Sequence, residues 1–232
     1  MKIIAAITSL SLIAITACAS ESAWPDALRT MPLGKHGLVL NRTNCAEVLL
    51  TGFKSNSTVK ALIFMPGATD ELYFFRRVNV TVTNANPTLL DAVTAITNQS
   101  PLRVTERDGF LLLFSCEDVL DLDIKIQHAR TAEKLRTGKP LPPLLMLDRD
   151  WTQFLEATQK RVGSRLWPYR GTRESWHFYR HTFAGWGLTP WETLQAAAYS
   201  GKTRFVVIRG RVDFWLDERV NELPKLDRFP GR

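Results

Sequence analysis

Five consecutive apolar residues, Phe110–Phe114, constrain the fold of this chain more than any other segment. Successive side chains of a β-strand point to opposite faces, so an unbroken apolar run must be covered on both sides. The Asp108-Gly109 pair directly before it favours a two-residue hairpin turn. Together with the preceding Leu102–Glu106 ("LRVTE"), the segment predicts a hairpin whose second strand lies inside a sheet, between two packed layers.

A capped helix is predicted just before this hairpin. Thr88 is the expected N-cap residue, and Asp91 stands at the third helical position. Pro101 ends the helix, because proline disfavours helical backbone in the residue before it. One buried stripe at helical spacing is expected from Leu89, Ala92, Val93 and Ile96.

The same order of elements returns near the end of the chain. Thr189 is the expected N-cap, Pro190 occupies the first helical position and Glu192 completes a capping box. Two strands, "FVVIR" and "VDFWL", then surround a Gly210-Arg211 turn. We interpret the two segments as separate examples of a common helix–strand–turn–strand unit rather than as a duplication.

The other predicted elements complete an α+β chain. Asn44 is expected to cap a helix that begins at Cys45, and Asp150 is expected to cap another, with Gln153 in the box position. An amphipathic helix is predicted over 117–138, followed by a proline-rich connector. The predicted fold class is α+β, built of small modules with mixed or antiparallel sheets and helices packed on one face.

Three short segments carry a resemblance to a known domain. They are "VNVTV" at 78–82, "TLLDAV" at 88–93 and "FLLLF" at 110–114 after its Asp-Gly turn. Over about 37–116 this order is similar to the short N-terminal (STN) domain of secretins and TonB-dependent receptors. The resemblance implies a small α+β interaction module in the bacterial envelope. Nothing after residue 116 is typical of an outer-membrane barrel or a secretin channel.

These observations divide the chain into six predicted parts. Their order is a signal peptide at 1–17, an irregular leader at 18–36, the STN-like module at 37–116, a helix and proline-rich connector at 117–147, a C-terminal α+β unit at 148–220, and a tail at 221–232.

The first residues have the pattern of an export signal. Lys2 precedes a short apolar stretch that ends at Ala17, which is too short for a membrane-spanning helix. "ITAC", ending at Cys18, is similar to the bacterial lipobox, in which the cysteine is acylated. We therefore expect a lipid-anchored protein of the outer membrane or periplasm. The alternative is ordinary cleavage before Ser20, which would give a soluble periplasmic or secreted protein.

Acylation of Cys18 would leave Cys45 and Cys116 as an even pair in an oxidising compartment. A disulfide between them would close a loop of about 70 residues and contribute about 4 kcal/mol in the chain-entropy description. The alternative is two separate buried thiols.

A segment rich in arginine and aromatic residues, 159–181, is the predicted binding surface in a chain of net charge +7. Its candidate residues are Arg165, Trp167, Tyr169, Arg170, Arg173, Trp176 and Arg180. Arginine forks and aromatic rings suit phosphates, carboxylates and sugars. Because export excludes nucleic acid, the expected partner is an envelope protein or an anionic envelope polymer or lipid.

One pattern suggests a metal instead. His177 and His181 are four residues apart, as on one face of a helix, and Glu174 would be a third ligand. Phe178, however, stands where a zinc peptidase of the HExxH type needs its glutamate. The chain has no nucleophile elbow, Walker loop or dinucleotide fingerprint. We therefore predict a binding or assembly module with no catalytic residues and no cofactor. A metal-dependent periplasmic hydrolase is the alternative.

Overall fold

The computed structural model describes a large part of the 232-residue chain. The described residues are 26–29, 31–34, 37–54, 59–65, 78–100, 102–114, 119, 121–168 and 180–219. Several predicted features lie outside them, namely the signal peptide, the tail, Cys18, Cys116, Tyr169, Arg170, Arg173, Glu174, Trp176 and His177.

The first half of the described chain alternates short strands and helices. In order, these are α1 (Asp26–Arg29), β1 (Leu38–Leu40), α2 (Cys45–Gly52), β2 (Ala61–Phe64), β3 (Val80–Val82), α3 (Leu89–Gln99), β4 (Arg103–Arg107) and β5 (Phe110–Phe114). The second half continues with β6 (Ile124–Ile126), α4 (Ala129–Arg136), β7 (Leu144–Asp150), α5 (Trp151–Val162), β8 (Arg165–Pro168), β9 (Arg180–Gly185), α6 (Pro190–Gly201), β10 (Thr203–Ile208) and β11 (Arg211–Leu216).

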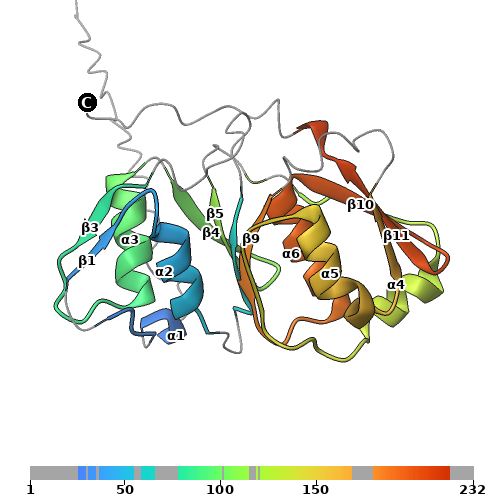
Figure 1. Cartoon of the computed structure of the whole chain (residues 1–232), viewed down its shortest axis with the longest axis horizontal. Helices are drawn as coiled ribbons and strands as arrows, with labels where there is room; N and C mark the ends of the chain where they lie inside the picture. Colours follow the sequence, from blue (N-terminus) through green and yellow to red (C-terminus); the bar gives the residue numbers. More distant parts are fainter. Residues whose placement is uncertain are drawn as a thin grey trace, which may run out of the picture.

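The elements form an α+β fold with mixed and antiparallel sheets, which confirms the predicted class, although helices cover both faces of the central sheet rather than the one face predicted (Figure 1). A five-stranded sheet in the order β4-β5-β2-β9-β7 runs through the middle of the molecule (Figure 1). Here β2 pairs parallel with β5 and antiparallel with β9. Strands from both of the predicted units, 37–116 and 148–220, therefore belong to one sheet.

Both faces of this central sheet are covered. On one face lie α1, α2, α3 and the β1–β3 pair, and on the other lie α4, α5, α6 and a second sheet (Figure 1). Alternate residues of β5 divide between the two cores: Leu112 belongs to the core that contains Phe154 and Phe205, whereas Leu111 and Leu113 belong to the core that contains Leu49 and Val93. The prediction that Phe110–Phe114 is covered on both sides is confirmed.

The second sheet has four strands in the order β6-β10-β11-β8. β10 and β11 form an antiparallel hairpin, while β6 and β8 pair parallel with its two outer sides. Phe205, Val207, Val212 and Phe214 are buried on its inner face. The other face of the hairpin carries Arg204, Arg211 and Asp213 together with the partly buried Val206, Ile208 and Trp215.

Local sequence signals placed many elements correctly. Thr88, Asp150 and Thr189 each cap a helix, as predicted, and each forms a complete capping box. The β4–β5 turn has positive φ at both Asp108 and Gly109, +56° and +75°, as expected of a turn that favours Asp-Gly.

Other local predictions were wrong. Asn44 precedes α2 but does not cap it, because its side chain instead accepts from Asn41 N (2.8 Å) and donates to Val39 O (3.1 Å). The second hairpin turns at Arg209-Gly210, so that Ile208 pairs with Arg211. Gly210 is the second loop residue, with φ of +72°.

The helix predicted over 117–138 begins only at Ala129. Residues Ile124–Ile126 form strand β6 instead, because they pair with Phe205–Val207 of β10, far away in the sequence. The predicted connector likewise contains the first residues of β7. In the part of the chain that the structure describes, no helix is long and apolar enough to cross a membrane.

Candidate functional site

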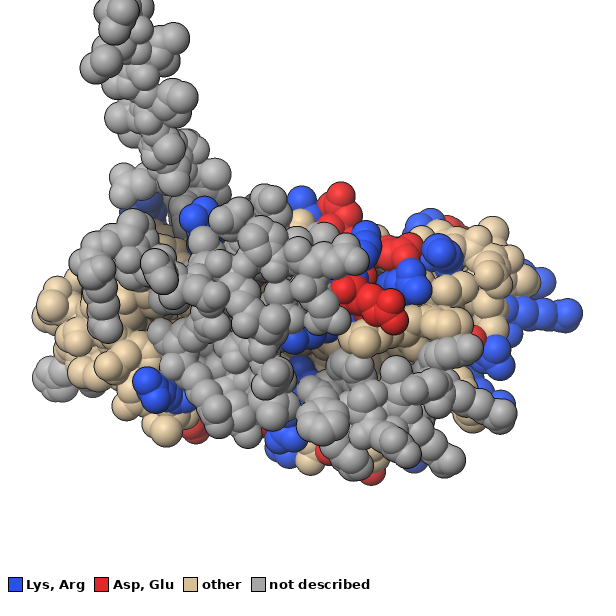
Figure 2. Space-filling view, turned by 90° about the horizontal axis from the view of Figure 1, so that it is seen from above, with Lys and Arg blue, Asp and Glu red and all other residues tan. Residues whose placement is uncertain are grey.

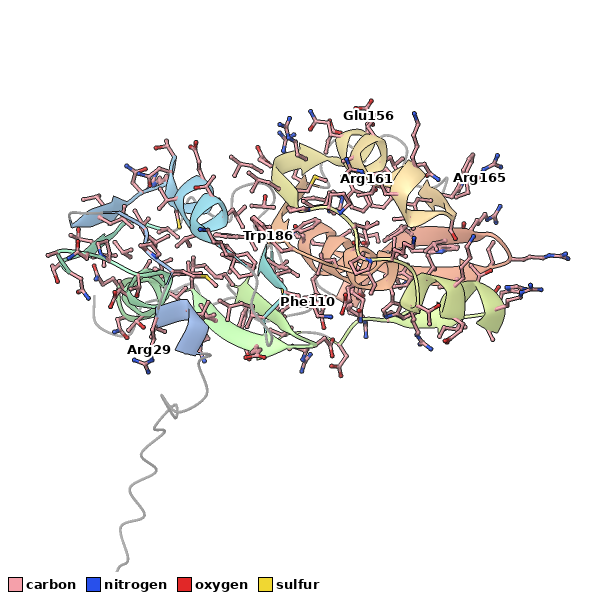
Figure 3. The ribbon with its side chains drawn as sticks, turned by 90° about the horizontal axis from the view of Figure 1, so that it is seen from below. Arg29, Phe110, Glu156, Arg161, Arg165 and Trp186 are labelled. Atoms are coloured by element: carbon pink, nitrogen blue, oxygen red, sulfur yellow. The ribbon has the colours of Figure 1, made fainter. Side chains whose placement is uncertain are left out.

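Exposed cationic side chains gather at the end of the molecule that carries the β10–β11 turn. They come from α4, the end of α5, the start of β8 and this turn; we call them the basic end, which consists of Arg130, Lys134, Lys160, Arg161, Arg165, Arg209 and Arg211. Lys and Arg side chains project from the right-hand end of the molecule in Figure 2, and Figure 3 places Arg161 and Arg165 toward this end.

Backbone contacts hold these segments together. The Lys134 ammonium donates to Gly163 O at the end of α5 (3.4 Å). Arg165 N donates to Gly210 O (3.2 Å), and Gly210 N donates to the Thr131 hydroxyl of α4 (3.2 Å). The turn between β10 and β11 is therefore fixed between α4 and β8, and the cations on these segments are brought to one place.

The charges at the basic end are largely uncompensated. Arg165 and Arg211 are register partners on parallel strands, and like charges side by side in a sheet destabilise it. Asp213 binds Arg211 with a two-pronged ion pair, Nε–Oδ1 at 2.8 Å and Nη2–Oδ2 at 3.0 Å. Within the described residues, no acid pairs with Arg130, Arg161, Arg165 or Arg209. This end therefore has an excess of positive charge that an external anion would relieve.

Three arginines outside the basic end differ, because each is paired with an acid of the chain. Arg107 pairs with Asp121 (2.8 Å), and Arg204 pairs with Asp123 (3.0 Å). Arg219 similarly pairs with Asp217 (2.6 Å). Such pairs satisfy the guanidinium donors internally, so an external anion would have to displace a carboxylate there.

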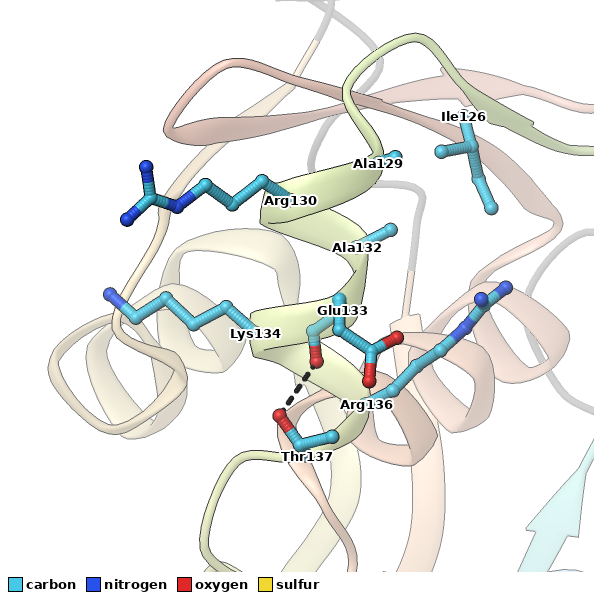
Figure 4. A pocket seen from close by; sticks show the side chains of 8 residues that line it. All are labelled: Ile126, Ala129, Arg130, Ala132, Glu133, Lys134, Arg136 and Thr137. Carbon is cyan, nitrogen blue, oxygen red and sulfur yellow. Dashed lines mark hydrogen bonds between the residues drawn. The ribbon is translucent and has the colours of Figure 1, made fainter.

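A surface hollow of about 720 Å³ runs along α4 (Figure 4). Arg130 and Lys134 project together from one side of the helix, while Ile126 and Ala129 lie on the other. The Arg136 guanidinium lies 4.5 Å from the centre of the Trp191 ring, a cation–π contact that holds it over α6. Glu133 also lines the hollow, which thus joins mainly cationic surface and apolar surface at the margin of the basic end.

The position of β8 is fixed by α5. Gly163 ends this helix in a left-handed conformation (φ +68°), which returns the chain toward the sheet. The Gln159 side chain then donates to Ser164 O and accepts from Leu166 N, both at 3.0 Å. The Gln159 side chain thereby satisfies the edge of β8 that faces away from β11. The backbone that carries the outward side chains of β8 is held in place.

The predicted binding residues are only partly brought together. Arg165 and Trp167 both lie on the outer face of β8, and the Trp167 side chain is 41% exposed. Arg180 lies elsewhere, on β9 of the central sheet, where it forms a two-pronged ion pair with Asp148 (Nη2–Oδ2 3.0 Å). Tyr169, Arg170, Arg173 and Trp176 lie outside the described residues.

The residues of the metal alternative do not form a site in the described structure. His181 is on strand β9 rather than on a helix, and it is fully buried beside Trp151 and Phe154, with ring centres 5.4 and 4.8 Å away. Burial lowers its pKa to about 4, against smaller opposing effects of the Ala197 backbone and Asp150. Its predicted partners His177 and Glu174 lie outside the described residues, among which no group of three ligands forms.

Cys45 is a free, fully buried thiol in this structure, while its predicted disulfide partner Cys116 lies outside the described residues. Burial raises the pKa of Cys45 to about 12, which keeps the thiol protonated and unreactive.

Sequence reasoning missed most of the basic end. Arg130, Lys134, Arg209 and Arg211 come from segments up to about 80 residues apart. The pairing of β11 with β8 brings Arg211 beside Arg165, and the contact of Gly210 with Thr131 brings α4 to the same place. A small local signal existed, because Arg130 and Lys134 have the i, i+4 spacing of one helix face.

Comparisons with protein-family models, curated proteins and solved structures gave no significant match to this chain.

Proposed function

We propose that this chain is a non-catalytic lipoprotein of the bacterial cell envelope that binds an envelope protein or an anionic envelope polymer. The proposal rests chiefly on the basic end, where Arg130, Arg165 and Arg209 converge without acidic partners among the described residues. Because unpaired like charges lower the stability of the fold, their accumulation favours a role in attracting an anion.

The proposal for the N-terminal part is supported by its order of elements, β1-α2-β2-β3-α3-β4-β5 over 38–114, in which a second helix is followed by a hairpin. We propose that this part is an STN-like interaction module, joined through the central sheet to a unit that supplies the basic end.

The proposed location follows from the N-terminal sequence. Signal cleavage before Cys18 and acylation of this residue would attach the protein to a membrane and place its folded part in the periplasm or at the outer membrane. Mass spectrometry of the protein isolated from a bacterial envelope tests this directly. A diacylglyceryl cysteine at the first residue is expected, whereas an unmodified N-terminus at Ser20 would contradict the anchor.

Charge reversal tests the binding role. The Arg130→Glu/Lys134→Glu variant changes two exposed side chains at the basic end, and Arg42→Glu/Lys54→Glu changes two exposed cations in the other half of the protein. In co-sedimentation with envelope fragments at low salt, the first variant should bind about tenfold more weakly than the parent chain. The control should bind like the parent chain.

The salt dependence of binding is a second test of the proposed role. Added salt should weaken binding of the parent chain and reduce the difference between it and the basic-end variant, because exposed charges are screened. Equal binding of the parent and the basic-end variant at low salt would overturn the proposal.

A further inference from the structure

Strand β8 presents an arginine and a tryptophan side by side to solvent. Arg165 and Trp167 are exposed, whereas Leu166 between them is 3% exposed and packs in the core. Residues two apart on a strand share one face and lie about 7 Å apart. The Gln159 contacts described above fix the backbone that carries them.

Of the two neighbouring arginines on β8 and β11, Arg165 is the one that can bind an external anion. In the next strand Arg211, its register partner, is already bound to Asp213, which is itself the register partner of Trp167. Among the described residues no carboxylate pairs with Arg165. The outer face of β8 thus combines the Arg165 guanidinium, which has no carboxylate partner among the described residues, with the large, partly exposed ring of Trp167.

This combination has a specific chemical complement. A guanidinium binds a carboxylate or phosphate through two parallel hydrogen bonds. An indole provides a flat apolar surface of defined shape, which matches the C–H-bearing face of a sugar ring. The reach from a hexose ring to its exocyclic acid group, together with the hydrogen bond from that group to a guanidinium, is comparable with the spacing of residues two apart on a strand.

We propose that Arg165 and Trp167 form a subsite for one acidic sugar unit of an anionic polysaccharide. The sugar ring packs on Trp167, and its carboxylate or phosphate binds the Arg165 fork. The other cations of the basic end attract the rest of the polymer. This inference rests on the proposed function and narrows its ligand from any envelope polyanion to an acidic glycan.

The experiment separates ring recognition from charge. Binding of the purified chain is measured by isothermal titration calorimetry with polygalacturonate, with dextran as the uncharged polysaccharide and with poly-glutamate as the polyanion without sugar. The variants are Trp167→Ala, Trp167→Phe and Arg165→Gln, each checked for folding by circular dichroism. Phosphorylated dextran, compared with polygalacturonate, distinguishes a phosphate from a carboxylate as the acid group.

An acidic-sugar subsite predicts a distinct pattern. Trp167→Ala should weaken polygalacturonate or phosphodextran binding about tenfold and leave poly-glutamate binding unchanged, since it removes the ring and no charge. Trp167→Phe should recover part of the loss. Arg165→Gln should weaken binding of every polyanion.

Other results would overturn the inference in distinguishable ways. If Trp167→Ala binds the acidic glycans as tightly as the parent chain, the ring subsite is wrong, while charge-based binding stands. If poly-glutamate binds more tightly than the glycans and loses affinity on Trp167→Ala, the subsite belongs to an acidic protein. If the parent chain binds no polyanion, both the inference and the polymer-binding form of the proposed function fall.

Discussion

Gly201, the last residue of α6, packs directly against the buried ring of His181: a Cβ placed at position 201 would lie 2.6 Å from the His181 Cε1 atom. His181 is itself enclosed by Trp151 and Phe154, so its ring has no free space into which to move. A rigid neighbour, rather than backbone conformation, therefore requires glycine at this position.

Gly201→Ala should consequently lower the free energy of unfolding by about 1–3 kcal/mol, the usual range for overfilling a packed core. Alanine is otherwise the better residue in a helix, so steric overlap should outweigh a favourable propensity. Urea unfolding followed by circular dichroism measures the change. In a His181→Ala background the same substitution should cost much less, and an equal cost in both backgrounds would rule out the contact as its cause.

The buried neutral state of His181 should make stability depend on pH. Its pKa is lowered to about 4 by burial, whereas an unfolded histidine has a pKa near 6.5, so the unfolded chain takes up the proton first. Stability should therefore fall as pH decreases from about 6.5 to about 4, by about 3 kcal/mol from this residue alone. Urea titrations across this range measure it.

The matched comparison for this pH effect is His181→Phe, which keeps a ring at the site and removes the titrating group. Its stability should vary less between pH 4 and 6.5 than that of the parent chain. If the free energy of unfolding changes equally with pH in the two proteins, His181 is not the residue responsible.

Asp213 should compete with an external anion for Arg211, because its carboxylate already occupies that fork. Asp213→Asn should therefore strengthen polyanion binding by about threefold at low salt, while slightly destabilising the fold. Asp121→Asn is the control, since it removes an exposed carboxylate that pairs with Arg107 instead. Calorimetric titration with polygalacturonate measures the affinity of each variant. Weaker binding by Asp213→Asn than by the parent chain would show that this carboxylate does not compete with the polyanion.

Gln159→Ala should act on binding without changing charge. It removes the two hydrogen bonds that fix β8, at a cost of about 1 kcal/mol, and leaves Leu166 N without its side-chain acceptor. Amide exchange at Leu166 should become faster, and glycan affinity should fall several-fold with Arg165 and Trp167 still present. Unchanged exchange at this amide would contradict the supporting role of Gln159.

Features encoded within a few residues were predictable from the sequence. The Asp108-Gly109 turn and the N-cap residues of α3, α5 and α6 depend on local backbone chemistry, and each is found at its predicted position. The cover on both faces of Phe110–Phe114 was also predictable, because it follows from a single apolar pattern.

Features created by distant pairing were not predictable in this way. Residues Ile124–Ile126 have the apolar spacing of a helix but form a strand, because β10 offers them a partner. His181 was expected on a helix beside His177, whereas pairing with β7 and burial under Trp151 place it in a sheet. The basic end depends on four separate segments. Lys160, Arg161 and Arg165 lie in the predicted binding segment 159–181, and Arg165 alone of the basic end was named as a binding residue.

The antiparallel pairing of β2 with β9 also has a consequence for how the molecule loses its structure. Ala61–Ile63 is joined to Phe183–Gly185 in the middle of the sheet, so removing either half would leave the other with an open, apolar strand edge. Heating should therefore melt the described part of the chain in one cooperative transition. Proteolytic cleavage within the proline-rich segment before β7 should yield two fragments that remain associated until that transition.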